Sequence, residues 1–301
     1  MTKIAAPDFD LAMTLNSGQV FHWEKHCNGF IGAIGDSGIY AEQRSKILRV
    51  AAADPRAEPA NVRRLIEHYF ALDHRLDEIC SSFPDDARLS TAREFCRGLR
   101  IIRQPKWECL ATFICSSMKQ VAHIRQISLA LRKRFGQAQT ICGRKVFTFP
   151  TAERIAKASE QQLRDCALGY RAKNLRATAR LIPRGEANLE RWSKLTDEQL
   201  RENLCELPGV GAKVANCVML FAYERISAFP IEVWIARVLR ENYFPRRRKV
   251  SEKKLAEFAA THFGKFGGYA QQYLFHHARV TANRRRKRQS VRRSGRKLRG
   301  F

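Results

Sequence analysis

The hydrophobic pattern of this chain changes after roughly its first fifty residues. Between residues 19 and 52, short apolar runs are separated by Gly, Asn, Asp and Ser, a pattern typical of strands joined by tight turns. We predict antiparallel strands in the segments QVFHWE, GFIGAIG, GIYAEQ and KILRVAA. After Asp54-Pro55, apolar residues recur three and four positions apart, which is the spacing of amphipathic helices. The remaining chain is therefore predicted to be helical.

The helical spacing recurs along most of the remaining chain. It is found in VRRLIEHYFAL, TAREFCRGL, WECLATFICSS, VAHIRQISLALRKRF, AERIAKAS, EQQLRDCAL, RAKNLRATARLI, DEQLRENLCEL, KVANCVMLFAY, VWIARVLREN, KKLAEFAATHF and YAQQYLFHHARV. The pattern predicts an α+β protein that is mostly helical. We place a small N-terminal antiparallel sheet domain at residues 1–90, a helical body at residues 91–283 and a tail at residues 284–301.

The charge of the chain is strongly positive. The 301 residues include 55 Lys and Arg against 29 Asp and Glu, which gives a formal net charge of +26. Ten of the basic residues and no acidic residue lie in the tail. A segment of this composition buries too little apolar surface to fold, so we expect residues 284–301 to be disordered and to contact phosphates. The excess charge indicates a polyanionic partner.

Cysteine usage and hydropathy exclude other classes of protein. No apolar run approaches the ~20 residues of a membrane helix, and the N-terminus lacks the cationic start and apolar core of a signal peptide. The nine cysteines include no C-x-x-C pair, and Cys217 is the last of them. A C-terminal cysteine quartet is therefore absent from the sequence, and we predict no iron–sulfur cluster. Reduced thiols are expected.

The segment LPGVGA joins two predicted helices and contains Gly209 and Gly211. Two glycines at this spacing allow a tight turn whose backbone N–H groups face a phosphate, as in a helix-hairpin-helix, although an ordinary helix-capping turn fits equally well. Lys213 begins the next helix beside apolar residues, which destabilises the cation and favours a nucleophilic amine. Considered alone, it is better explained as a solvated surface lysine.

Two further side chains accompany this lysine. Cys217 lies four residues later on the same helix face and could line the same pocket, although cysteine is also a common core residue. Glu232 opens the following helix, where the helix dipole favours a carboxylate. From its spacing alone, this helix-terminal role is the preferred explanation for Glu232.

The motifs LPGVGAKVANC, AFPIEVW, RQPKWECLATFICSS and LGYRA together resemble the 8-oxoguanine DNA glycosylase family of the helix-hairpin-helix (HhH-GPD) glycosylases. The resemblance extends to SGQVFHW, YFALD and YAQQYLF, so only the tail falls outside it. It implies a bifunctional DNA glycosylase and AP lyase of base excision repair, which flips 8-oxoguanine out of duplex DNA and excises it through a lysine Schiff base.

The resemblance assigns roles to the residues of the pocket. Lys213 corresponds to the catalytic lysine, and Glu232 stands where the family has a catalytic aspartate. Gly18 resembles the glycine whose carbonyl accepts the N7 hydrogen of 8-oxoguanine, a hydrogen that guanine lacks. Cys217 and Phe275 correspond to the two residues that sandwich the flipped base. Gln271 corresponds to the residue that reads its Watson–Crick edge.

The residues expected to contact DNA depart more from the family. Met118 replaces an asparagine that fills the gap left by the flipped base, and His123 replaces an arginine that reads the opposite cytosine. Arg171, beside Tyr170, keeps the second arginine. Trp234 stands where the family commonly has histidine. Because Met118 cannot read the opposite base by strong hydrogen bonds, the resemblance does not fix the opposite-base preference.

The family needs no cofactor, although its hairpin holds a monovalent cation. The corresponding ligands here would be backbone carbonyls, those of Cys205, Leu207 and Val210. We expect a monomer that binds double-stranded DNA containing oxidised guanine and does not bind membranes. It would be intracellular, in a bacterial cytoplasm or nucleoid or in a eukaryotic nucleus. Two alternatives are a weakly active or inactive protein that binds damaged DNA, and a glycosylase for another damaged purine.

Overall fold

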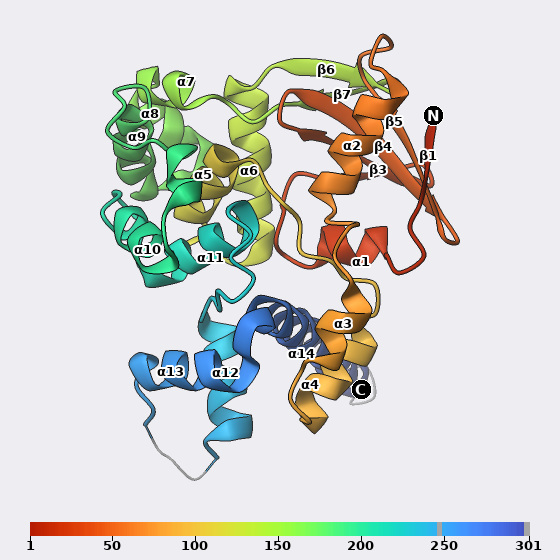
Figure 1. Cartoon of the computed structure of the whole chain (residues 1–301), viewed down its shortest axis with the longest axis vertical. Coiled ribbons are helices and arrows are strands. Elements are labelled where there is room, and N and C mark those ends of the chain that lie inside the picture. The colour runs from red at the N-terminus through yellow and green to blue at the C-terminus, as the bar shows by residue number, and fades with distance from the viewer. Residues whose placement is uncertain (246–248, 298–301) are drawn as a thin grey trace.

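The computed structural model describes the backbone of residues 1–245 and 249–297, and the side chains of residues 1–245 and 249–284. Figure 1 shows an antiparallel sheet beside a group of helices that runs from α5 to α11. A second helical group, containing α12, α13 and the start of α14, lies below them together with α3 and α4. This arrangement confirms the predicted fold class, an antiparallel sheet followed by a helical body.

The N-terminal sheet has the strand order β1-β5-β4-β3-β2, and all its strand pairs are antiparallel. Its strands are β1 (Thr2–Ala5), β2 (Glu24–His26), β3 (Gly29–Ile34), β4 (Ser37–Arg44) and β5 (Ile47–Ala52). The three predicted strands within residues 29–52 are confirmed. The predicted strand QVFHWE is wrong except at Glu24, because residues 19–23 are all buried and follow an irregular path between the sheet and the helices. β1 was not predicted.

A two-stranded hairpin of β6 (Ala138–Ile141) and β7 (Arg144–Phe147) was also not predicted. It lies within the helical part of the chain but packs against β3 and β4 of the N-terminal sheet. Four buried side chains make this contact, and they are Ile31, Tyr40, Ile141 and Val146. The backbone N–H of Gly38 also donates to the Gln139 side chain at 2.5 Å. The hairpin therefore ties the sheet to the helical body.

Each predicted helical segment contains a helix. Their bounds are α2 (Pro59–Tyr69), α4 (Ala87–Phe95), α5 (Lys106–Ser116), α6 (Val121–Phe135), α7 (Ala152–Lys157), α8 (Glu160–Leu163), α9 (Arg171–Leu181), α10 (Asp197–Cys205), α11 (Ala212–Ala222), α12 (Val233–Tyr243), α13 (Glu252–Phe263) and α14 (Gly267–Lys297). The short helices α1 (Leu11–Asn16) and α3 (Leu76–Ser81) were not predicted. One large buried cluster contains side chains from most of the helices, and a second lies between the sheet and α2.

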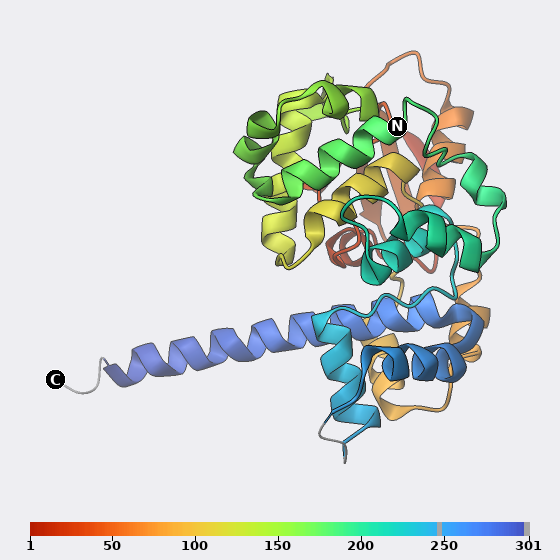
Figure 2. The same ribbon diagram turned by 90° about the vertical axis from the view of Figure 1, so that its left-hand side faces the viewer.

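The prediction of a disordered tail is wrong for residues 284–297, which continue α14 to Lys297. Figure 2 shows this part of the helix extending away from the rest of the molecule. Arg, Lys and Gln have favourable helix propensities, and this stretch contains no proline. Tyr269 and Tyr273, in the first turns of α14, are buried in the core. Because the start of the helix is already formed there, adding further helical residues costs little. Residues 298–301 lie outside the described residues.

The described part of the chain contains neither a membrane-spanning helix nor a cluster of metal-binding side chains. In residues 1–245 and 249–297, no helix combines the length and apolar character needed to cross a bilayer. Within the same part of the chain, no group of three or more His, Cys, Asp or Glu side chains is placed to hold a metal ion.

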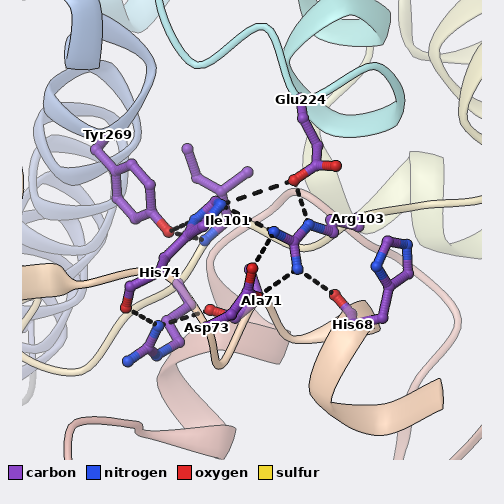
Figure 3. A network of polar contacts seen from close by, with 9 residues as sticks. His68, Ala71, Asp73, His74, Ile101, Arg103, Glu224 and Tyr269 are labelled. Atoms are coloured by element: carbon purple, nitrogen blue, oxygen red, sulfur yellow. Dashed lines mark hydrogen bonds and ion pairs between the residues drawn. The ribbon is translucent and has the colours of Figure 1, made fainter. Parts of the chain in front are cut away.

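A network of polar contacts joins the end of α11 and the start of α14 to the segment before α3 and the segment after α4 (Figure 3). The Arg103 guanidinium donates to both carboxylate oxygens of Asp73, at 2.5 and 2.8 Å, and to Glu224, which follows α11. His74 Nδ1 lies 2.7 Å from the hydroxyl of Tyr269 on α14. The network therefore holds α11 and α14 in a fixed relation to each other.

We expect Arg103→Gln to remove a pH-dependent part of the stability. Hydrogen bonds from Arg103 lower the pKa of Asp73 to about 2, and hydrogen bonds from His74 and Arg103 lower that of Glu224 to about 2. A carboxyl group with a lowered pKa in the folded state stabilises the fold above its unfolded-state pKa, and this contribution is lost as the pH falls through the folded-state value. The wild-type free energy of unfolding should therefore decrease between about pH 4 and pH 2 more steeply than that of the variant.

Urea unfolding at several pH values measures this difference. Both carboxylates are more than a third exposed to solvent, so the expected loss at neutral pH is only about 1 kcal/mol. Arg144→Gln, which changes an exposed arginine of β7, is the matched control and should keep the wild-type pH dependence. Identical pH profiles for Arg103→Gln and the wild type would contradict the assignment.

Candidate active site

The hairpin between α10 and α11 is anchored to α9. Gly209 has a φ of +84°, and a Cβ built on it would lie 2.8 Å from the Asn174 Cβ, so only glycine fits at this position. The Thr178 hydroxyl donates to the carbonyl of Pro208 at 2.9 Å. Gly211 is the N-cap of α11, and a Cβ there would meet no atom of the described residues within 4 Å. The hairpin is thus packed on one side and open at the start of α11.

Lys213 lies in the first turn of α11 and is half-buried. Its Nζ is 3.0 Å from the Ser116 Oγ at the end of α5, and 5.3 Å from the centroid of the Phe113 ring. These contacts place the amine between α5 and α11 instead of in bulk solvent.

Cys217 lies one turn further along α11 and is 4% exposed. Burial raises the pKa of its thiol, while the neighbouring Lys213 opposes that rise and the Glu232 carboxylate adds to it. Lys213 and Cys217 lie four residues apart on α11 and share one face of it, and the charge of Glu232 also affects the thiol pKa. The structure therefore brings the predicted lysine, cysteine and glutamate to one place.

Glu232 is the N-cap of α12, and its Oε1 accepts a hydrogen bond from the Ile235 N–H at 2.8 Å. Burial raises the pKa of its carboxyl group, and the N–H groups of Trp234 and Ile235 and the charge of Lys213 oppose that rise. Glu232 therefore caps α12, as its spacing indicated. Its carboxyl group is at the same time close enough to Lys213 for the charge of the lysine to affect its pKa.

Gly18 and α14 meet although they are more than 250 positions apart. Gly18 has a φ of +92°, and a Cβ built there would lie 3.0 Å from the Phe275 Cε1, so this backbone approaches the ring as only glycine allows. The Gln272 amide donates to the carbonyl of Ser17 at 3.3 Å and holds the loop against the helix.

Gln271 faces inwards on the same helix and is 3% exposed. Its Oε1 is buried and finds no hydrogen-bond partner among the side chains and backbone that the structure describes. A buried acceptor left unpaired costs roughly 1–3 kcal/mol. Such an oxygen is available to an N–H group of a bound ligand.

The loop after α5 projects Met118 outwards. Met118 is 95% exposed and has a φ of +53°, which is unusual for a residue with a side chain. Arg171 is only 5% exposed, and its guanidinium donates to the carbonyl of Ser117 and stacks 4.3 Å from the Tyr170 ring. Arg171 therefore holds the backbone of the loop at Ser117, and its guanidinium is not exposed to a ligand.

The remaining predicted contact residues lie at the surface. His123 is exposed in the first turn of α6, and Tyr170 is 61% exposed. Trp234 is half-buried, with the Arg237 guanidinium 5.4 Å from its ring centroid. Neither Arg237 nor Ser116 was predicted as a site residue. Spacing gives no signal for Ser116, because it lies 97 positions from the lysine that it contacts.

A buried ionic cluster orients α5 from its other end. Glu108 on α5 pairs with Arg132 on α6, and His22 Nδ1 lies 3.5 Å from the same carboxylate oxygen. Burial and the charge of Arg132 lower the pKa of His22 well below its usual value. The neutral imidazole lies between α5 and β3, where its Nε2 is 2.8 Å from the carbonyl of Ala33.

Comparison with known proteins places this geometry in a family. A model of the 8-oxoguanine DNA glycosylase N-terminal domain matches residues 1–110, and a model of HhH-GPD superfamily base excision DNA repair proteins matches residues 111–261. A probable N-glycosylase/DNA lyase of Methanothermobacter thermautotrophicus is 30% identical, and the match covers 92% of this chain and 96% of the relative. The N-glycosylase/DNA lyase OGG1 of Arabidopsis thaliana is 28% identical over 91% of this chain and 78% of its own length.

A solved structure agrees over nearly the whole fold. The Clostridium acetobutylicum 8-oxoguanine glycosylase/lyase, in complex with double-stranded DNA containing cytosine opposite 8-oxoguanine, superposes with a TM-score of 0.86 at 28% identity. The match covers 94% of this chain and 99% of that one. The chain is thus a base excision DNA repair protein of the HhH-GPD superfamily. Within that superfamily it belongs to the 8-oxoguanine DNA glycosylase family.

Proposed function

We propose that this protein is a bifunctional DNA glycosylase and AP lyase that excises 8-oxoguanine from duplex DNA and nicks the strand. The observation that carries the proposal is the position of the Lys213 amine. It lies out of bulk solvent and shares one site with the Cys217 thiol and the Glu232 carboxylate. This combination suits attack on a sugar carbon beside a bound base.

The proposed reaction begins when the lone pair of the Lys213 Nζ forms a bond to C1′ of the damaged nucleotide. The C1′–N9 bond breaks, and its electron pair leaves with the base, which takes up the proton that the attacking amine gives up. The bond between C1′ and the ring oxygen then breaks, the oxygen takes a proton from solvent, and the nitrogen lone pair completes a protonated Schiff base. Loss of a C2′ proton then expels the 3′ phosphate by β-elimination. Positive charge develops on the sugar during this sequence, and the Glu232 carboxylate stabilises that charge.

The base would be bound between α11 and α14. The Gly18 carbonyl would accept the N7 hydrogen of 8-oxoguanine, whereas guanine would oppose it with a second acceptor. Cys217 and Phe275 would cover the two faces of the base. The buried, unpaired Oε1 of Gln271 supports its role as an acceptor for the N–H groups of the Watson–Crick edge.

The remaining contacts would hold the DNA backbone and the strand opposite the lesion. Met118 would fill the gap left by the flipped base as an apolar wedge, which its 95% exposure supports. His123, Tyr170 and Trp234 would contact the strands around it. Arg171 would act through the loop that it supports.

The hairpin would bind a phosphate through the backbone at Gly209 and Gly211, next to a monovalent cation. The cation would be held by the backbone carbonyls of Cys205, Leu207 and Val210. We place the enzyme on chromosomal DNA, in the nucleoid of a prokaryote or the nucleus of a eukaryote.

Borohydride trapping tests the proposal. Incubation with a duplex containing 8-oxoguanine opposite cytosine, followed by borohydride, should reduce the Schiff base to a stable crosslink between protein and DNA. Duplexes that contain guanine or an alkylated purine are the controls. DNA binding without a crosslink would favour the inactive DNA-binding alternative, and crosslinking only to the alkylated duplex would favour the other glycosylase.

A further inference from the structure

We propose that Ser116 positions the Lys213 amine for attack, an inference that rests on the proposed function. Ser116 is the last residue of α5 and is 4% exposed. Its Oγ lies 3.0 Å from the Lys213 Nζ. Neither the lysine motif nor the hairpin indicates this contact, which exists only because α5 packs beside α11.

The hydroxyl has a fixed orientation. Ser116 Oγ lies 2.7 Å from the carbonyl of Phe113, three residues earlier on the helix, and donates its only hydrogen to that oxygen. It therefore meets Lys213 as an acceptor. A neutral amine that donates one N–H to Ser116 has its lone pair directed elsewhere. A serine that donated to the amine would instead occupy the lone pair needed for attack.

The Phe113 ring restricts the amine from a second direction. The Lys213 Nζ lies 5.3 Å from the ring centroid, a distance at which the protonated amine is attracted to the ring. The ring offers the neutral amine no strong directional acceptor. Of the two contacts with α5, only the one to Ser116 sets the rotation of the amine about its final carbon–nitrogen bond.

Ser116 also connects the nucleophile to the loop proposed to enter the DNA. Its carbonyl accepts a hydrogen bond from the Lys119 N–H at 3.1 Å, which closes the turn around Met118. The next carbonyl, that of Ser117, is held by Arg171. One turn of backbone therefore connects the exposed loop tip to the residue that holds the amine.

Ser116→Ala in the full-length protein tests the inference. We expect the single-turnover rate of borohydride trapping to fall roughly 10- to 100-fold, because a misplacement of ~1 Å can cost about 100-fold in rate. Trapping at a preformed abasic site should fall by the same factor, since both reactions use the same amine. The Kd for a duplex with a reduced abasic analogue, which cannot form a Schiff base, should not change.

Conservative and matched variants separate positioning from a structural role. Ser116→Thr keeps the hydroxyl and should recover most of the rate, whereas Ser128→Ala removes a buried hydroxyl from α6 and should trap at the wild-type rate. If Ser116→Ala fails to fold, Ser116→Cys, with its weaker acceptor, makes the same comparison. Wild-type trapping by Ser116→Ala, or a defect confined to the Kd, would overturn the inference. Absence of trapping by the wild-type protein would instead contradict the proposed function.

Discussion

Lys213→Gln is expected to abolish the borohydride-trapped complex and strand nicking while DNA binding persists. Glutamine has a similar length but no nucleophilic nitrogen, because its amide lone pair is delocalised. Its N–H groups could still donate to the Ser116 hydroxyl, so the contact between α5 and α11 would be retained. Removal of a covalent nucleophile typically costs on the order of 10⁴-fold or more in rate.

Gel analysis of the crosslink, with electrophoretic mobility to measure binding, gives both readouts in one experiment. Lys46→Gln makes the same chemical change at an exposed turn of the N-terminal sheet and should trap like the wild type. The proposed nucleophile would be rejected if Lys213→Gln formed the crosslink at a comparable rate. Loss of DNA binding together with trapping would mean that the lysine serves binding instead.

Glu232→Gln is expected to slow excision of 8-oxoguanine roughly 100- to 1,000-fold, the typical cost of removing one electrostatic stabiliser of a transition state. The glutamine side-chain oxygen could still accept the hydrogen bond from the Ile235 N–H, so the N-terminus of α12 should stay capped. The wild type and Glu232→Gln should then have similar unfolding curves but different excision rates. Glu232→Asp, which keeps the charge and moves it by one methylene, should lose less activity than Glu232→Gln.

The raised pKa of Glu232 predicts the acidic side of the pH profile. Because burial raises this pKa, the carboxylate begins to take up a proton at a higher pH than an exposed glutamate. Only the ionised form stabilises positive charge on the sugar, so the excision rate should fall as the pH decreases through the raised value. Single-turnover rates measured from neutral pH downwards should show this fall in the wild type and not in Glu232→Gln. A fall of the same size in both proteins would assign it to another group.

The sequence predicted the main elements and much of the candidate site. Helical periodicity located each predicted helix because most of them pack one face into the large buried cluster. It failed for residues 19–23, where consecutive residues are all buried and no alternation exists. The prediction of disorder for residues 284–297 failed for another reason. It was made from composition, which shows how little apolar surface the segment can bury but gives no information on a helix that is already nucleated upstream.

Some features of the candidate site follow from the sequence, and others depend on the tertiary structure. Lys213 and Cys217 lie one helical turn apart, so their common face follows from the sequence alone, as do the hairpin glycines and the positive charge. The contacts of Ser116 with Lys213 and of Gly18 with Phe275, and the use of Arg171 to support the loop at Ser117, depend on the tertiary structure. Periodicity reports the environment of each residue along one element. The distances between segments far apart in the chain are set by how helices and sheet pack together, and no local pattern encodes them.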